Sequence, residues 1–297
     1  MNKTWPFVLL LIPVLAWSSA PGTTALSFLK IGAGARSASM GDCGTALARD
    51  ASATYWNPAR LLGFRGQSIA LGHNEWMQGV RYEQVAWGAS TGGMAFGLSL
   101  GGLYVGGLEL RDEATEFPLE TFSAYDFAFG ASLAMKFGEN LEAGFTYKRL
   151  YERIYVDHGT GWAWDLGVAY NTPFRGLRAA GVVANLGPKF KLVREGYKLP
   201  TTFKLGIGYE PERRIWRGRG SAGMDLVKAV DSPLKVQLGG EYWYREKLAL
   251  RAGYKFRSDT ENLTTGAGFR VGKILLDYAF VPNRLGPTHR AGLGYSW

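Results

Sequence analysis

The feature that most constrains this chain is an alternation of side chains with a period of two, which recurs from Gly66 to Trp297. In segment 248–256, for example, Leu, Leu, Ala, Tyr and Phe alternate with Ala, Arg, Gly and Lys. A β-strand places successive side chains on opposite faces, whereas an amphipathic helix repeats its apolar residues three and four positions apart. The chain is therefore expected to be all-β.

The character of the second face favours a membrane barrel over a soluble sandwich. A water-facing sheet surface would carry long polar side chains, but here that face consists mostly of Gly, Ala and Ser with isolated charges. The first face is apolar over its whole length, with Tyr, Trp or Phe near its ends, which is typical of a lipid-facing band with aromatic girdles. We therefore predict a transmembrane antiparallel β-barrel.

The alternating segments number about fourteen, an even count as expected for a bacterial barrel. The predicted strands lie near 66–75, 80–90, 93–104, 121–137, 140–152, 160–171, 177–187, 199–210, 218–227, 233–244, 247–257, 262–271, 273–281 and 288–297. Four longer polar stretches, 105–120, 188–198, 210–217 and 281–287, are candidates for external loops.

The N-terminus has the order of a secretory signal peptide: Lys3, an apolar run over 5–17, and the small residues 18–20. Cleavage after Ala20 would leave Pro21 at the new N-terminus, so we favour cleavage after Ala25 and assign residues 1–25 to the signal peptide. No other stretch resembles a transmembrane helix, and an exported chain without one can span a membrane only as a closed barrel. The lipid bilayer of a Gram-negative cell outer membrane is the expected location.

Composition argues against nucleic-acid binding and against an enzyme. The net charge is +9, but Lys and Arg are scattered singly rather than in basic runs. His73, His158 and His289 fall in three separate segments, without the spacing of a metal site or a catalytic triad. The single Cys43 is expected to be a small packing residue. We predict no catalytic residues, no cofactor and no metal.

Isolated charges at alternate positions are expected to point into the lumen. They could form a paired network that holds a plug, or they could line a polar passage. The predicted lumen charges are Glu142, Lys148, Asp165, Lys204, Glu241, Arg251, Lys255, Arg270 and Asp277.

The last strand ends on an aromatic residue, as outer-membrane barrels do when they present a C-terminal signal to the barrel insertion machinery. Leu293, Tyr295 and Trp297 share one face of this strand. We predict that these three residues form the insertion signal.

Residues 26–63 do not alternate, and small residues dominate them, so this segment could fold compactly inside a barrel. Segment 28–41 (FLKIGAGARSASMG) and segment 51–59 (ASATYWNPA) resemble the start of the PorV/PorQ family of outer-membrane proteins. The ending LDYAFVP at 276–282, followed by THR at 288–290, resembles the same family. Asp42–Cys43 and Arg60 depart from the family pattern.

The resemblance implies a FadL-like architecture, in which an N-terminal hatch at 26–63 plugs a fourteen-stranded barrel at 64–297. The hatch motif it implies comprises Arg36, Trp56, Asn57, Pro58 and Ala59.

The resemblance also implies a function in protein export or cell-surface attachment by type IX secretion, with secreted cargo proteins as partners. Two alternatives stay open: a FadL-like passive channel for fatty acids or other hydrophobic molecules, and a structural envelope barrel. Transport would require an apolar pocket, for which Phe28, Met40 and Tyr55 are candidates. Cargo binding would require apolar external loops, and 105–120 supplies Leu108, Leu110, Phe117 and Leu119.

Overall fold

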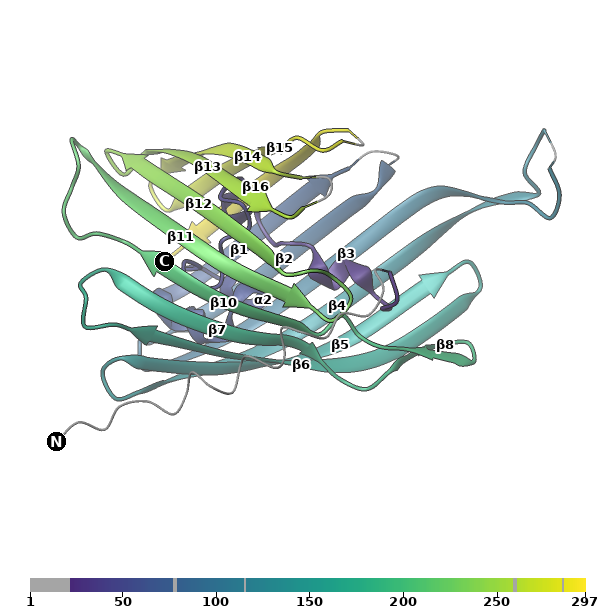
Figure 1. Ribbon diagram of the computed structural model, residues 1–297, viewed down its shortest axis with the longest axis horizontal. Coiled ribbons are helices and arrows are strands. Elements are labelled where there is room, and N and C mark those ends of the chain that lie inside the picture. The colour runs from purple at the N-terminus through teal and green to yellow at the C-terminus, as the bar shows by residue number, and fades with distance from the viewer. Residues whose placement is uncertain (1–21, 77–78, 115, 259–260, 285) are drawn as a thin grey trace.

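The computed structural model describes residues 22–76, 79–114, 116–258, 261–284 and 286–297, which form a barrel around the N-terminal segment (Figure 1). Most of the predicted signal peptide lies outside the described residues. Among the residues described, no helix is long and apolar enough to cross a membrane.

The barrel closes through fourteen antiparallel strands, each paired with the next, and the last strand pairs with the first. This confirms the predicted fold class and strand number. The barrel strands are β1 (Gly66–Glu75), β2 (Arg81–Ser90), β3 (Met94–Leu110), β4 (Glu120–Phe137), β5 (Leu141–Ile154), β6 (Asp157–Asn171), β7 (Leu177–Leu186), β10 (Thr202–Tyr209), β11 (Gly218–Ala229), β12 (Lys235–Tyr244), β13 (Leu248–Phe256), β14 (Leu263–Val271), β15 (Ile274–Val281) and β16 (Thr288–Ser296).

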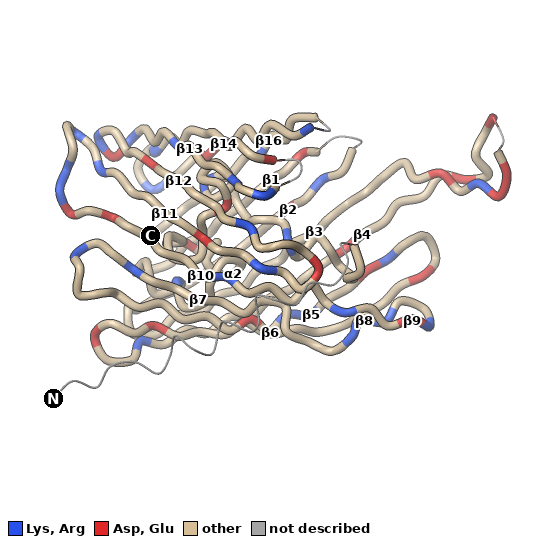
Figure 2. The backbone as a smooth tube through the Cα atoms, viewed as in Figure 1, with Lys and Arg blue, Asp and Glu red and all other residues tan. Residues whose placement is uncertain are grey.

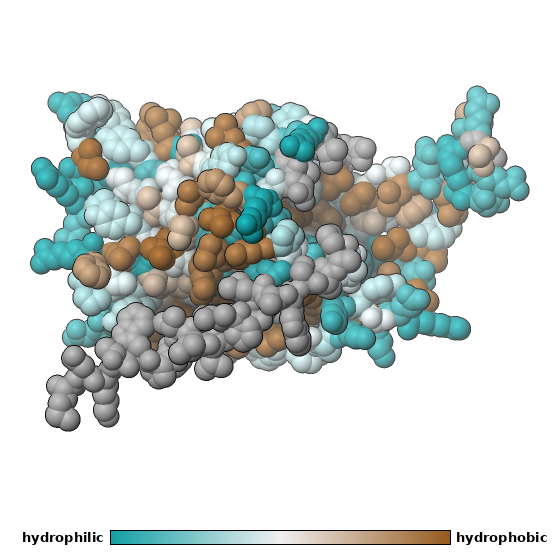
Figure 3. All heavy atoms as spheres, in the orientation of Figure 1, coloured by the Kyte–Doolittle hydropathy of each residue, from teal (hydrophilic) through white to brown (hydrophobic). Residues whose placement is uncertain are grey.

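The two faces of the wall differ as the alternation predicted. Along β13, exposed and buried residues alternate strictly, with Leu250 and Phe256 outside and Arg251 and Lys255 inside. Apolar side chains cover the visible outer surface between more polar ends (Figure 3). The outer face therefore suits hydrocarbon, while the inner face holds charge.

The strand β3 is longer than predicted, because it ends at Leu110 rather than near residue 104, whereas β4 matches its predicted range to within one residue. Together they project beyond the rest of the barrel (Figure 1). We call residues 105–124, which form the end of this hairpin, the arm. The pairing of β3 with β4 shifts register between Val105 and Leu108 and then continues to Leu110 opposite Glu120. Much of the stretch 105–120 is thus paired strand rather than loop.

The four predicted external loops do not all lie at one end of the barrel. Successive strands run in opposite directions, so the connections alternate between the two ends of the barrel. Segment 210–217 joins β10 to β11 and therefore lies opposite the arm and the 188–198 segment. Segment 188–198 also contains a small hairpin of its own, β8 (Phe190–Leu192) and β9 (Glu195–Tyr197).

The N-terminal segment lies inside the barrel and forms four short helical turns: η2 (Ser27–Lys30), α1 (Ala35–Ser39), α2 (Ala53–Trp56) and η3 (Pro58–Gly63). Helix α1 contacts β13 to β16, whereas η3 contacts β2 to β6. We call residues 26–63 the hatch. It packs closely because its residues are small and the wall opposite them carries glycine: the Met40 backbone, for example, lies where Gly239 and Gly253 leave room for it.

Candidate functional site

A buried ion-pair network fixes the hatch to the wall. Both carboxylate oxygens of Glu241 accept hydrogen bonds from Arg36, from Nε at 3.0 Å and from Nη2 at 2.9 Å. Glu241 also accepts from Arg49 at 2.9 Å and from Arg251 at 2.6 Å, and Arg251 continues to Asp277 at 2.7 Å. Burial by itself would lower the pKa of Arg36, but the Glu241 carboxylate raises it above its ordinary value. Arg36 is therefore held as a cation.

A second group of contacts holds the Asn-Pro-Ala turn. Asn57 Nδ2 donates to the carbonyls of Thr45 at 3.0 Å and Val168 at 3.1 Å, while its Oδ1 accepts from the Ala59 N–H at 3.1 Å. Arg60 Nη1 pairs with Glu142 at 2.6 Å. The Asn57 side chain thus caps η3 and ties it to β6, with Pro58 at the first helical position.

The remaining residues of the implied hatch motif are also buried. Trp56 donates its indole N–H to the Ala33 carbonyl at 2.9 Å, and Pro58 and Ala59 lie in the buried part of η3. The structure therefore brings Trp56, Asn57, Pro58 and Ala59 together, and places Arg36 in the ion-pair network with Glu241.

Most of the predicted lumen charges have partners of opposite sign. Lys148 lies 2.6 Å from Asp165, and Lys255 Nζ lies 2.5 Å from Asp42 and 2.9 Å from Glu261. Burial would raise the pKa of Asp42, but Lys255 and Arg290 together lower it below its ordinary value. The arrangement fits the paired network rather than the open passage.

The two remaining predicted lumen charges contact aromatic rings instead. Lys204 Nζ lies 4.9 Å from the centroid of Trp56, and the Arg270 guanidinium lies 4.5 Å from that of Trp243. No ion pair of either side chain occurs among the described residues.

Several charged residues of the site escaped the sequence analysis. Asp225, which accepts a hydrogen bond from the Thr45 N–H at 3.0 Å, occupies an inward position of β11 that the alternation rule could have identified. Arg49 bridges Glu210 and Glu241. Its position could not be predicted from the sequence, because the hatch has no repeating pattern.

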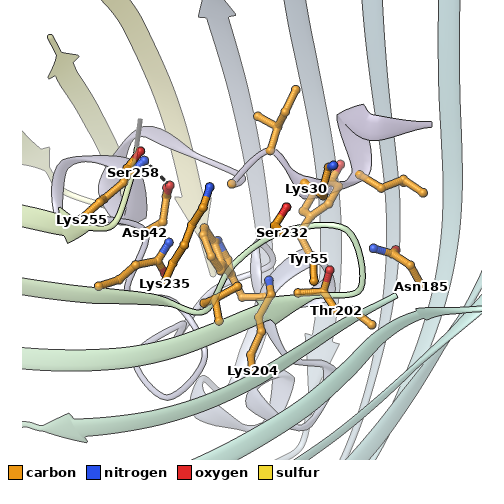
Figure 4. A pocket seen from close by; sticks show the side chains of 18 of the residues that line it. Lys30, Asp42, Tyr55, Asn185, Thr202, Lys204, Ser232, Lys235, Lys255 and Ser258 are labelled. Carbon is orange, nitrogen blue, oxygen red and sulfur yellow. Dashed lines mark ion pairs between the residues drawn. The ribbon is translucent and has the colours of Figure 1, made fainter. Parts of the chain in front are cut away.

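A cavity of about 250 Å³ lies between the hatch and the end of the barrel that bears the arm, and we call it the chamber (Figure 4). Its floor comes from the hatch, with Ile31, Asp42 and Tyr55. Its cationic lining residues are Lys30, Lys148, Lys204, Lys235, Lys255 and Arg290. Two further cavities, of about 510 and 460 Å³, lie against the opposite side of the hatch and are also rich in arginine.

The three residues suggested for an apolar pocket are separated. Tyr55 lines the chamber and donates its hydroxyl to the Leu100 carbonyl at 2.7 Å. Phe28 packs edge-on against Tyr82, with ring centroids 6.0 Å apart. Met40 is buried against Gly239 of the wall. These residues therefore do not form one apolar pocket.

The three histidines make separate side-chain contacts, although His73 and His289 lie on the paired strands β1 and β16. His73 Nδ1 is 2.6 Å from Glu83, His289 Nδ1 is 2.6 Å from the Tyr278 hydroxyl, and His158 lies against the Tyr151 ring. Within the described ranges, no three His, Cys, Asp or Glu residues are grouped so as to hold a metal ion.

The C-terminal residues lie on the outer surface of the barrel. Leu293, Tyr295 and Trp297 are all exposed there, and the Trp297 N–H donates to the Gln67 carbonyl at 2.9 Å. Their role in insertion stays a prediction.

Comparison with known proteins identifies a family that the chain matches. The family model described as type IX secretion system protein PorV matches residues 18–212, which confirms the resemblance found in the sequence. No curated protein sequence matches significantly.

The fold itself is shared with solved hydrocarbon transporters. The Ralstonia pickettii toluene transporter TbuX has a TM-score of 0.63 at 15% identity, over 90% of this chain and 98% of that one. The monoaromatic hydrocarbon channel CymD has a TM-score of 0.63 at 14% identity, over 90% of this chain and 98% of that one. The P. putida toluene transporter TodX has a TM-score of 0.59 at 14% identity, over 90% of this chain and 99% of that one.

Proposed function

The chain belongs to the PorV family of type IX secretion proteins, and from this premise we propose that it serves export as a closed barrel that binds secreted proteins or secretion components through its arm. It is an integral barrel of the cell outer membrane, embedded in the lipid bilayer.

The observation that carries this proposal is the closed lumen. The hatch is tied to the wall by the Arg36–Glu241–Arg251 network and by the Arg60–Glu142 pair, and all of these side chains are buried. Breaking a buried ion pair costs about 3–5 kcal/mol. A folded or extended polypeptide therefore has no path through the barrel while the hatch is docked, and contact with cargo has to occur outside it.

The arm is the surface best suited to that contact. Phe117 is 75% exposed and Leu119 is 63% exposed, both in the connection between β3 and β4. Acidic side chains surround them, and Figure 2 shows their concentration at the tip of the arm. Exposed apolar residues inside a polar rim are typical of a protein-binding site.

The orientation of the barrel supports an external arm. The connections at the arm's end include the long 187–201 segment, whereas those at the other end include the short 91–93 and 138–140 turns. In bacterial barrels the short turns face the periplasm and the longer loops face outside.

The test is to remove the arm without opening the barrel. Val105 and Ala124 are paired, so an Asn-Gly turn can join them in place of residues 106–123. We expect the shortened protein to insert into the outer membrane at the normal level, while the cells lose the same surface proteins as a gene-deletion strain. Normal surface proteins in that strain would refute a role of the arm.

A matched pair of point variants separates binding from general surface effects. Phe117→Ser alters the arm, whereas Phe174→Ser alters an equally exposed phenylalanine, at 73%, at the opposite end of the barrel. We expect Phe117→Ser alone to reduce the amount of surface-attached protein. Equal defects in the two strains would contradict the proposal.

The passive-channel function is a second candidate, favoured by the fold that the chain shares with TbuX, CymD and TodX. It would require the hatch to move or a path around it to open. Uptake of labelled fatty acid and of toluene by the gene-deletion strain would distinguish the candidates, because only a channel predicts slower uptake with intact surface proteins.

We further propose that the protein has no catalytic activity and needs no cofactor. The separate side-chain contacts of the three histidines support this, as does the absence of a metal-binding group from the described ranges. The barrel insertion machinery is the remaining proposed partner, through Leu293, Tyr295 and Trp297.

A further inference from the structure

We propose that the chamber is a binding site for a small organic carboxylate, with Lys204 as the residue that anchors the carboxylate group. This site is separate from the proposed secretion function, which depends on the arm. The argument has three parts: charge, the nature of the walls, and size.

The charge of the chamber is only partly balanced. Of its six cationic lining residues, four have carboxylate partners: Lys30 with Asp231, Lys148 with Asp165, and Lys255 and Arg290 with Asp42 and Glu261. Neither Lys204 nor Lys235 has an ion pair or hydrogen bond within the described part of the chain. Figure 4 shows both ammonium groups pointing into the same space. Two cations facing one cavity favour an anionic occupant.

The walls next to Lys204 are aromatic and aliphatic. Its ammonium lies 4.9 Å from the Trp56 ring centroid, and Tyr55, Ile31 and Val227 line the same cavity. A cationic group beside an apolar wall favours a molecule with an acidic group on an apolar body. A neutral hydrocarbon would leave the cation uncompensated.

The volume limits the ligand. The chamber measures about 250 Å³, and an apolar cavity of roughly 150 Å³ is known to hold one benzene molecule. One aromatic ring with a carboxylate therefore fits, whereas a long acyl chain does not. Benzoate is the simplest probe with the required shape and charge.

A lysine inside the barrel without an ion-pair partner can serve the fold through its contact with Trp56, or it can serve a ligand. Replacement by methionine keeps most of the side chain's length and apolar character but removes the charge and its contact with the Trp56 ring. If Lys204 only supported the fold, Lys204→Met would lower stability. If it binds a ligand, the variant should be at least as stable and should bind less.

Calorimetry with benzoate on the full mature barrel in detergent tests the site. We expect wild type to bind benzoate and Lys204→Met to bind it at least about tenfold more weakly, since one charge-assisted bond is lost. Lys204→Arg, which keeps the charge, should retain binding. The matched control is Lys228→Met: Lys228 lies on the neighbouring strand, donates to the Ser232 carbonyl, and lines the outer apolar surface with Leu205.

The outcomes are distinct. Weak binding by Lys204→Met, with unchanged binding by Lys228→Met and an undiminished unfolding midpoint, supports the site. Three results would overturn it: no benzoate binding by wild type at millimolar concentration, equal binding by Lys204→Met, or toluene binding as tightly as benzoate. The export test on the arm-deleted strain does not depend on benzoate binding. Failure of one proposal therefore leaves the other testable.

Discussion

At the scale of single residues, the most consequential side chain is Glu241. Its carboxylate accepts from Arg36, Arg49 and Arg251, and two of these arginines also pair with a second acid, Arg49 with Glu210 and Arg251 with Asp277. The sequence predicted that Glu241 points inward but could not indicate which cations it meets, because two of them come from the hatch.

Glu241→Gln is expected to destabilise the barrel by about 3–5 kcal/mol, because it leaves the buried Arg36 guanidinium without its ion-pair partner. Glu246→Gln breaks the exposed Arg219–Glu246 pair and is expected to cost less than about 1 kcal/mol. Urea unfolding in lipid vesicles measures both values. Equal losses would mean that the network contributes no more than a surface pair.

Cys43 provides a second test at this scale. It is buried in the hatch, and burial, reinforced by nearby carboxylates, raises the pKa of its thiol well above the ordinary value. Because the thiolate is the reactive form, we expect Cys43 to resist maleimide at neutral pH until the protein is unfolded.

The control for that labelling is a new exposed cysteine. Val156→Cys in a Cys43→Ser background places a thiol in the turn between β5 and β6, at a site that is 67% exposed. This thiol should react at once in the folded barrel. Rapid labelling of Cys43 itself would show that the hatch leaves its site.

At the scale of elements, two adjacent glycines of β12 have different roles. A Cβ on Gly239 would overlap the Met40 carbonyl of the hatch, whereas a Cβ on Gly240 would meet nothing closer than the Ser221 carbonyl at 3.8 Å. The wall is therefore shaped to the hatch on its inner face only.

Gly239→Ala is accordingly expected to displace the hatch and cost about 1–3 kcal/mol, the range for overpacking. Gly240→Ala should be neutral, or slightly stabilising through the unfolded chain. Trypsin digestion provides a direct measurement, because Arg36 and Arg60 are buried and become accessible only when the hatch moves. Matching digestion patterns would argue against the close contact with Met40.

The elements also show what sequence reasoning could and could not reach. Strand positions followed from the alternation, because every barrel strand has one face toward lipid. The length of β3, which forms one side of the arm, was underestimated because Gly106 and Gly107 interrupt the alternation at the register shift. The hairpin of β8 and β9 was missed because each of its strands has only three residues. The three residues predicted to form an apolar pocket, Phe28, Met40 and Tyr55, proved to be separated. The hatch has no repeating pattern from which neighbours in space could be derived.

At the scale of the whole molecule, docking of the hatch should depend on pH through Asp42. The pKa of Asp42 in the folded protein is below its ordinary value, and that of the unfolded chain is about 3.9. The pair with Lys255 therefore stabilises the folded state fully above the unfolded pKa and stops doing so as pH falls through the folded pKa.

The stability difference between wild type and Asp42→Asn should accordingly be constant above about pH 5 and shrink below about pH 4. Urea unfolding at a series of pH values measures it. A difference that grows on acidification would reverse the sign and refute the assigned pairing.

The pairing of β1 with β16 has a consequence for how the molecule is made. The hatch precedes every barrel strand in the chain, yet α1 contacts the final strands, β13 to β16. The inner surface that holds α1 is therefore complete only when the C-terminal strands have formed. Pairing of β16 with β1 closes the wall around the hatch, so sealing of the lumen depends on both ends of the chain.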